Sequence, residues 1–139
     1  MALSPSFARG WHVSGILRLR AGQPDAAIER VEASLRFSPR ARTGWPFFVI
    51  GASHFFNRRF DETLPKLLLA IQDDASHTEA YRTLAACYAH MGRLDEGREI
   101  VERLRAITPV VVPGAVPYRN LEHRELFLSG LRLAAGEGT

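Results

Sequence analysis

The residues that could do chemistry in this chain are few, and their spacing does not bring them together. Cys87 and His90 stand three positions apart, which places a thiol and an imidazole, two common zinc ligands, on one face of a predicted helix. No further ligand follows at a comparable spacing, and the other histidines are dispersed along the chain. The expectation is therefore a buried thiol beside an imidazole at the edge of a groove, with no metal and no cofactor.

Patterns that mark other kinds of active site are missing as well. The early glycines recur at a spacing that indicates packing between helices rather than a loop around a phosphate, namely Gly10, Gly15, Gly22 and Gly51. No serine lies in the context of a nucleophile elbow. The sequence thus predicts a chain that is not itself an enzyme, which leaves binding as the function to consider.

The composition predicts one cytoplasmic globular domain. The chain has 139 residues, of which 46% are hydrophobic and 24% charged, as in ordinary folded proteins. It contains no apolar run near the roughly 18 residues that cross a bilayer, and its first residues lack the pattern of a secretory signal. The net charge is only +3, and arginines alternate with glutamates instead of clustering. We therefore expect neither a membrane nor a nucleic acid as partner.

Three segments of the chain repeat one pattern, and these are the elements that must position any binding residues. Residues 8–39, 44–75 and 78–109 align at offsets of 36 and 34 residues, which predicts stacked helical units. The shared columns hold a large aromatic residue, a small residue, a turn residue and an aspartate. In that order they are Trp11, Phe47 and Tyr81; Gly15, Gly51 and Ala85; Gly22, Arg58 and Gly92; and Asp25, Asp61 and Asp95.

Each repeat is predicted to form two antiparallel helices. Apolar residues recur at three- and four-residue steps, and the small columns let the two helices of a unit approach closely. The column aspartates are expected to cap the second helices, and Ser76 with Glu79 has the spacing of a capping box. After a linker, Asn120 is expected to cap a seventh helix that covers the exposed face of the last pair. The six earlier helices are expected at residues 8–21, 25–37, 44–57, 61–73, 78–91 and 95–107.

A helix–turn–helix unit of about 34 residues with these columns resembles the tetratricopeptide repeat. The resemblance covers residues 8–109 and implies an all-α solenoid of three units followed by a capping helix. The second unit is divergent, with Arg58 at a usual glycine and Thr63 at a usual alanine. The implied organisation is the tail of a truncated preceding repeat at 1–7, repeats at 8–41, 42–77 and 78–109, a linker at 110–119 and the capping helix at 120–135.

Both ends of the chain predict that it is part of a longer protein. Leu3-Ser4-Pro5 precedes Phe37-Ser38-Pro39 by 34 residues and looks like the end of an earlier repeat. The chain is then expected to begin inside a longer solenoid, either as the C-terminal part of a larger protein or as a version truncated at Met1. Loss of that repeat leaves an open, apolar N-terminal face that could form a homodimer. The runs AYRTLAACYAHMGRLDEGREIVERLRAITP and PYRNLEHRELFLSGLRLAA resemble the C-terminal region of bacterial, especially alphaproteobacterial, class III adenylate cyclases. That resemblance implies a regulatory or dimerisation region whose catalytic domain, the source of cyclic AMP, lies outside this chain.

The first helix of each unit is expected to line a concave groove, where its outward positions meet a partner. The middle unit is unusually aromatic there, and burying two or three rings could supply several kcal/mol at about 25 cal/mol per Å². The alternative is that these rings fill a core between the first two units. The candidate partner-binding residues are Arg9, His12, Ile16, Arg20, Trp45, Phe48, Ala52, Phe55, Phe56, Arg82, Ala86 and His90.

The expected partner is a protein or a peptide. The clamp that this repeat family uses for chaperone tails needs Lys, Asn and Arg, whereas those positions here hold His12, Ile16, Val49, Glu79 and Thr83. The target should therefore be mainly apolar: an amphipathic helix, an extended segment or a helix of the same polypeptide. Groove arginines could also hold a partner's carboxylates, so an acidic partner fits too.

Two functions are compatible with these sequence features. The first is a protein-interaction module, the C-terminal part of a larger bacterial signalling protein. The second is the regulatory or dimerisation region of a class III adenylate cyclase. A third class, helical repeats that read the bases of single-stranded RNA, is disfavoured because the groove is apolar in its middle.

Overall fold

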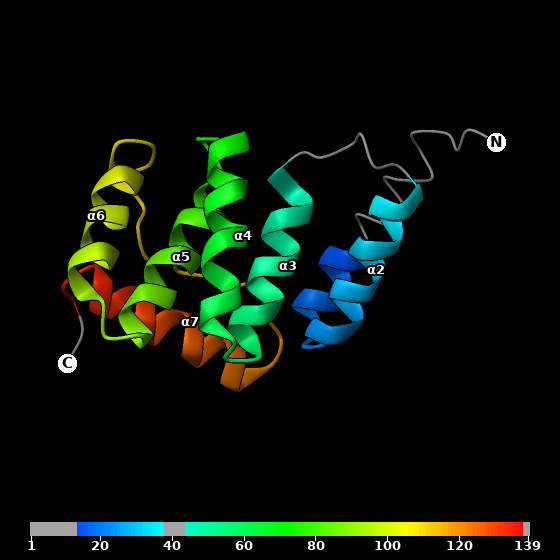
Figure 1. Ribbon diagram of the computed structural model, residues 1–139. Helices are drawn as coiled ribbons and strands as arrows, with labels where there is room; N and C mark the ends of the chain where they lie inside the picture. Colours follow the sequence, from blue (N-terminus) through cyan, green and yellow to red (C-terminus); the bar gives the residue numbers. More distant parts are fainter. Residues whose placement is uncertain (1–13, 38–43, 138–139) are drawn as a thin grey trace.

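The chain folds into helices that stack in pairs, with one more helix crossing them (Figure 1). The computed structural model describes residues 14–37 and 44–137. Within those ranges there is no strand, and the fold is the all-α solenoid that the repeats predict. Residues 14–20 form the described part of the first helix. The others are α2 (Pro24–Phe37), α3 (Gly44–Phe56), α4 (Phe60–Asp73), α5 (Thr78–His90), α6 (Leu94–Arg105) and α7 (Leu121–Ala134).

The small residues of the repeat lie where the two helices of a unit meet, as their column predicts. A Cβ added to Gly15 would stand 2.8 Å from Cγ2 of Val31 on α2, and one on Gly51 would stand 2.9 Å from Cδ2 of Leu67 on α4. Real Cβ atoms do not approach other heavy atoms so closely. Each glycine therefore sets the distance between the first and second helix of its own unit.

The turn inside each unit has the same backbone conformation in all three repeats. Gly22 and Gly92 have φ values of +85° and +78°, in the left-handed region that glycine adopts without steric cost. Arg58, at the matching position of the divergent second unit, also adopts this conformation, with φ of +60°. The arginine thus keeps the turn that joins α3 to α4, although its Cβ makes that conformation costly.

The predicted caps are partly wrong. The helix cap before α5 is His77, whose Nδ1 accepts a hydrogen bond from the amide of Ala80 at 3.3 Å, and not Ser76, whose hydroxyl donates to Asp74 instead. Neither α4 nor α6 has a side-chain cap, since Asp61 and Asp95 fall within the first helical turn rather than before it. Carboxylates there still favour the helix because they face the positive end of its dipole.

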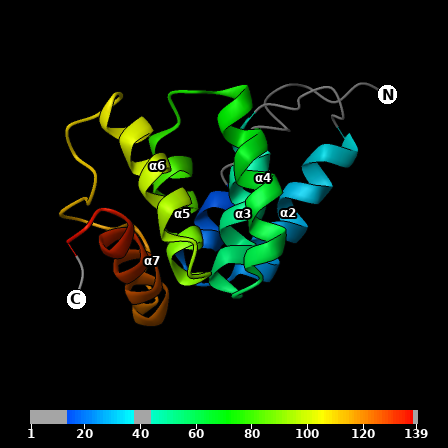
Figure 2. The same ribbon diagram turned by 60° about the vertical axis from the view of Figure 1, so that its left-hand side comes forward.

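The seventh helix begins as predicted. Oδ1 of Asn120 accepts hydrogen bonds from the amides of Glu122 and His123, at 2.9 and 3.1 Å. The helix then packs against α5 and α6, the last pair of the array. Figure 2 shows α7 on the side of the array where α5 and α6 lie.

The core follows the seam of the solenoid instead of a single centre. Every residue of α5 from Ala80 to Ala89 is buried, because α4, α6 and α7 all pack around this helix. Phe55 on α3 and Phe127 on α7 are among the largest fully buried side chains. No helix within the described ranges is long and apolar enough to span a bilayer.

Candidate functional site

Residues 106–134, which we call the C-terminal segment, lie over the face formed by the first helices of the three units. The anchor at its start is Arg82 on α5, whose side chain is nearly buried. Its Nε donates to the carbonyl of Val111 at 3.0 Å and its Nη2 to that of Val110 at 2.7 Å. Its Nη1 also pairs with Glu79 at 2.7 Å. One guanidinium therefore satisfies two carbonyls of a stretch that lacks regular structure.

The middle of the C-terminal segment crosses to the first two units. Tyr118 is only 2% exposed and packs edge-on against Phe56, with ring centres 4.6 Å apart. The amide of Arg119 donates to the carbonyl of Arg20 at 2.9 Å, which joins the segment to the first described helix. The segment thus reaches from α6 to residues 14–20 before α7 returns along α5.

α7 lies directly on the backbone of α5. A Cβ added to Gly130 would meet the carbonyl oxygen of Ala86 at 2.7 Å, so glycine allows this close approach. Nε2 of His90 lies 2.6 Å from the carbonyl oxygen of Leu126, within hydrogen-bond distance. Near the start of α7 the ring of His123 stacks on Phe56, with centres 4.6 Å apart and planes 17° from parallel.

The C-terminal segment and the neighbouring helices bury much of the predicted groove. Ala52, Phe55 and Ala86 have no exposed surface, and Phe56 retains 5%. The aromatic residues of the middle unit were expected either to line a groove or to fill a core. Phe55 and Phe56 belong to the core of the described structure. His90 is half-buried between α7 and the ring of Phe60. Arg82 is engaged within the chain.

The rest of the predicted groove lies at the end where the first two units meet. Ile16 and Trp45 are half-buried, Phe48 is 9% exposed and Arg20 is exposed. Arg9 and His12 lie outside the described residues. The structure brings Ile16, Arg20, Trp45 and Phe48 together around one hollow and separates them from Ala86 and His90, which α7 covers.

That hollow, which we call the first-helix pocket, has a volume of about 410 Å³. Its walls are mainly apolar, and its rim carries both acidic and basic groups. Phe48 lies in its wall, and the Phe48 ring packs against His77 with centres 4.8 Å apart. The described lining residues are Ile16, Leu19, Arg20, Trp45, Phe48, Asp73, Asp74, His77, Glu79, Pro117 and Tyr118.

The charges at the rim of the first-helix pocket are held by local contacts. The hydroxyl and amide of Ser76 donate to Asp74 at 2.6 and 3.0 Å, and these bonds lower the pKa of the Asp74 carboxyl. Glu79 faces the pocket while it pairs with Arg82. Burial raises the pKa of the Tyr118 hydroxyl, so this phenol stays protonated and takes no acid–base role near neutral pH.

The cysteine and histidine that could have shared a metal do not form such a site. The Cys87 thiol points to the carbonyl oxygen of Phe60, 3.7 Å away, and burial raises the pKa of this thiol to about 12. It is therefore neither a thiolate nucleophile nor a ready metal ligand. Nowhere in residues 14–37 or 44–137 do three or more His, Cys, Asp or Glu side chains gather in a way that could hold a metal ion.

Sequence reasoning missed the contribution of the linker. Pro117 and Tyr118 line the first-helix pocket, although residues 110–119 were predicted only to connect α6 with α7. Two signals were present in the sequence: Tyr118 is the one aromatic residue of the linker, and Gly130 and Ala134 are spaced to lie on one face of α7. Small residues at such spacing indicate a helix that approaches another backbone closely.

Comparisons with known proteins agree with this architecture. Residues 57–110 match the family model described as a tetratricopeptide repeat. No curated protein sequence matches the chain. Among solved structures, the first TPR of Spaghetti (RPAP3) bound to the HSP90 peptide SRMEEVD is similar, with a TM-score of 0.70 and 19% identity, over 96% of this chain and 97% of that one.

Two further structures give the same result. The first TPR domain of the human RPAP3 protein has a TM-score of 0.68 and 19% identity, over 96% of this chain and 97% of that one. The MamA protein has a TM-score of 0.68 and 18% identity, over 96% of this chain and 66% of that one. At these identities the likeness concerns the fold. Residues 57–110 are thus identified by sequence as tetratricopeptide repeat, and the described chain has the fold of a tetratricopeptide-repeat solenoid.

Proposed function

We propose that this chain is a non-catalytic protein-interaction module that takes up part of a peptide or helix in the first-helix pocket. The observation that carries the proposal is the pocket itself. Its apolar wall, which includes Ile16, Trp45 and Phe48, remains hollow where the C-terminal segment has covered the rest of the first-helix face. The peptide bound to the first TPR of Spaghetti, a protein of the same fold, supports peptide binding as the class of function.

The walls of the pocket favour a large apolar side chain as the anchor. Burying one leucine, phenylalanine or methionine side chain is worth about 1.5–3 kcal/mol. That energy alone gives weak affinity, so main-chain contacts along the rim must add to it. Arg20 can supply one such contact, because its exposed guanidinium can hold a carbonyl or carboxylate of the partner.

A strongly acidic partner fits the pocket less well than a mainly apolar one. Asp73, Asp74 and Glu79 stand at the rim, where they repel carboxylates that approach from that side. Arg82, one of the groove cations expected to attract an acidic partner, is already bonded to Glu79 and to the linker carbonyls. A partner that combines an apolar anchor with a carboxylate facing only Arg20 matches these charges.

Selection from a random peptide library on the full chain tests this proposal. We expect enriched peptides to share a large apolar residue, and we expect Trp45→Ala or Ile16→Asp to weaken the best peptide at least about tenfold. The control is Leu68→Ala, since Leu68 is 42% exposed on α4 and does not line the pocket. Enrichment of no peptide, or equal binding by Trp45→Ala and the native chain, contradicts the proposal.

The cyclase context is a proposal about the parent protein, and it is supported by the resemblance of the C-terminal runs. The second run, which starts at Pro117, supplies two of the pocket's lining residues, Pro117 and Tyr118, and the whole of α7. In such a parent, the effect of a ligand bound in the pocket would be transmitted through the first unit to the preceding part of the protein. The gene that encodes the chain decides this point: an upstream reading frame for a cyclase catalytic domain supports the proposal, and an unrelated upstream gene contradicts it.

A further inference from the structure

We propose that the outer side of residues 14–20 is a docking surface for an acidic amphipathic helix. We call this surface the N-terminal face, and it lies on the helix side that carries Leu17, whereas the first-helix pocket is lined by Ile16. This surface shares Arg20 and Pro117 with the first-helix pocket. The proposal rests on Leu17, Arg18 and Arg119, which do not line the pocket, and so does not depend on peptide binding there. The described residues that line it are Ser14, Leu17, Arg18, Arg20, Ala21, Pro117 and Arg119.

The repeat register shows that this face is shaped to receive a helix. Leu17 aligns with Ser53 and Cys87 in the second and third units, which are both fully buried. Cys87 is buried against Phe60 on α4, the second helix of the preceding unit. Leu17 occupies the same position in the first unit and is 59% exposed. A second helix of the same kind would therefore cover Leu17.

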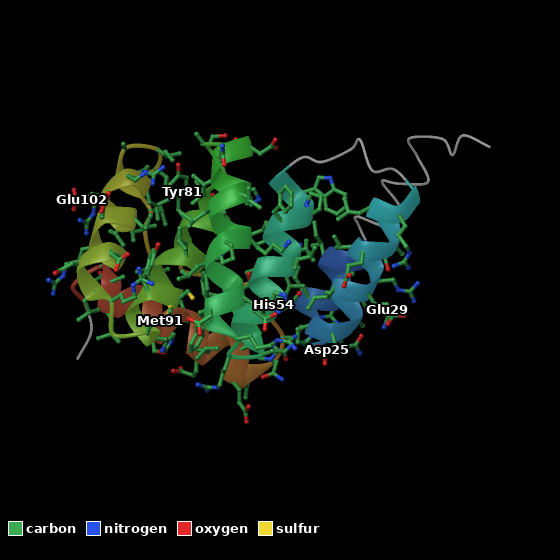
Figure 3. All side chains as sticks on the ribbon, viewed as in Figure 1. Asp25, Glu29, His54, Tyr81, Met91 and Glu102 are labelled. Carbon is green, nitrogen blue, oxygen red and sulfur yellow. The ribbon has the colours of Figure 1, made fainter. Side chains whose placement is uncertain are left out.

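The chain's own junctions between units show which chemistry that helix carries. Asp25, at the lower end of α2 in Figure 3, accepts a hydrogen bond from Nδ2 of Asn57 at 2.9 Å and lies 3.4 Å from Nη2 of Arg59. Asn57 and Arg59 belong to the turn of the following unit. An acidic group at the start of one unit's second helix thus meets polar or cationic groups of the next unit.

The positive charge of the N-terminal face favours an acidic helix as its partner. Arg18, Arg20 and Arg119 surround a hollow of about 730 Å³, and none of its described lining residues is acidic. The Arg18 guanidinium donates to Oε1 of Gln23 at 2.8 Å, and the backbone amide of Arg119 donates to the backbone carbonyl of Arg20 at 2.9 Å, which places residues 119 and 20 side by side. Carboxylates beside an apolar stripe would pair with these guanidinium groups while the stripe covers Leu17.

The same charges oppose a symmetric homodimer through this face. A two-fold axis would place the arginines of one copy against those of the other, and like charges brought together across an interface disfavour association. The N-terminal face is therefore assigned to a partner of opposite charge, and self-association becomes an outcome that the test must detect.

The experiment uses a synthetic helix with the sequence of α4, the helix that covers the matching position of the third unit. The peptide comprises Phe60–Asp73 and is stapled through the exposed positions 68 and 72, since isolated helices shorter than roughly 12–15 residues are marginal in water. In the matched control peptide, the three acidic residues of the sequence are replaced by lysine. Binding of each peptide to the full chain is measured by fluorescence anisotropy at low and high salt.

We expect the acidic peptide to bind at least about tenfold more tightly than its lysine control, and salt to weaken it. Leu17→Asp and the double variant Arg18→Glu with Arg119→Glu should each weaken it at least about tenfold, whereas Trp45→Ala, which changes the first-helix pocket alone, should leave it unchanged. The side chains replaced on the N-terminal face are exposed, so folding should be retained. Equal binding of both peptides, indifference to Leu17→Asp, or a homodimer in light scattering that Leu17→Asp disperses would overturn the proposal.

Discussion

The guanidinium of Arg82 donates a hydrogen bond to the carbonyl oxygen of Val111 at 3.0 Å and so fixes an irregular linker over α5. The contact joins residues 29 positions apart. It directs the chain after α6 back across the first-helix face, where Tyr118 and α7 then pack. The path of the C-terminal segment over this face therefore starts at one buried cation, Arg82.

Replacing Arg82 by methionine should loosen the linker first. The variant keeps an apolar stem but leaves two carbonyls and Glu79 without a donor, and hydrogen bonds to charged groups are worth about 1.5–3 kcal/mol. We expect the free energy of unfolding in urea to fall by about 2–3 kcal/mol, with faster amide exchange at residues 106–118. Arg105→Met, which removes an exposed pair with Glu102, should cost less than about 0.5 kcal/mol. Equal losses in the two variants would contradict this role.

Adding a single methyl group at Gly130 should lift α7 from α5. The new Cβ would stand 2.7 Å from both the carbonyl oxygen of Ala86 and the ring of His90. Overpacking of this kind costs about 1–3 kcal/mol, which urea denaturation of Gly130→Ala should show. Gly114→Ala is the matched control, because nothing lies within 4 Å of the Cβ it would add. A Gly130→Ala chain as stable as the control would show that α7 does not pack so closely.

Arg58→Gly should stabilise the chain. Arg58 holds φ at +60°, and the left-handed conformation costs a residue with a Cβ about 1–2 kcal/mol. Glycine removes that cost but loses more entropy on folding, so the net gain should be about 0.5–1 kcal/mol. The reverse change, Gly92→Ala, should destabilise by about 1 kcal/mol, since its Cβ meets open space and only the backbone is strained. The measurement is thermal unfolding. A melting temperature that shifts in the same direction in both variants would contradict the shared turn geometry.

Acidification should weaken the packing of α7 through His123. Burial against Phe56 lowers the pKa of His123 below its ordinary value of 6.5, so the unfolded chain binds this proton more readily than the folded chain. The neutral ring makes its full contribution to the free energy of unfolding above about pH 6.5. This contribution is lost as the pH falls toward the lowered pKa.

The measurement is the free energy of unfolding between about pH 7.5 and pH 5.5. His123→Phe keeps an aromatic ring beside Phe56 without a titrating group, so it should show a smaller loss over this range than the native chain. Some loss should remain, because burial also lowers the pKa of His54 despite the attraction of Glu62. Identical pH profiles for the two chains would exclude a role of His123.

The helices could be predicted because each repeat is a local unit. The spacing of Gly15 and Gly51 indicates where two neighbouring helices touch, and the structure places both glycines there. The capping box at Ser76 was predicted wrongly because Asp74 competes for its hydroxyl, which leaves His77 to cap α5. Such competition between short polar side chains is settled by local geometry that residue spacing does not describe.

The site was predicted only in part, because the path of the C-terminal segment is set by contacts distant in sequence. Periodicity placed Phe55 and Phe56 equally well in a groove and in a core. What buries Phe56 is Tyr118 and His123, more than 60 residues further along the chain. The repeat pattern ends before these residues, so it carried no information about where they would pack.

The most direct test of the proposed function is the mapping of a selected peptide on the isotope-labelled full chain by NMR chemical shifts. We expect the largest changes on the residues lining the first-helix pocket, including Ile16, Trp45 and Tyr118, while the exposed side of α6 around Arg98 and Glu102 stays unchanged. Changes confined to the outer faces of α4 and α6, with none at Trp45, would contradict peptide binding in the pocket.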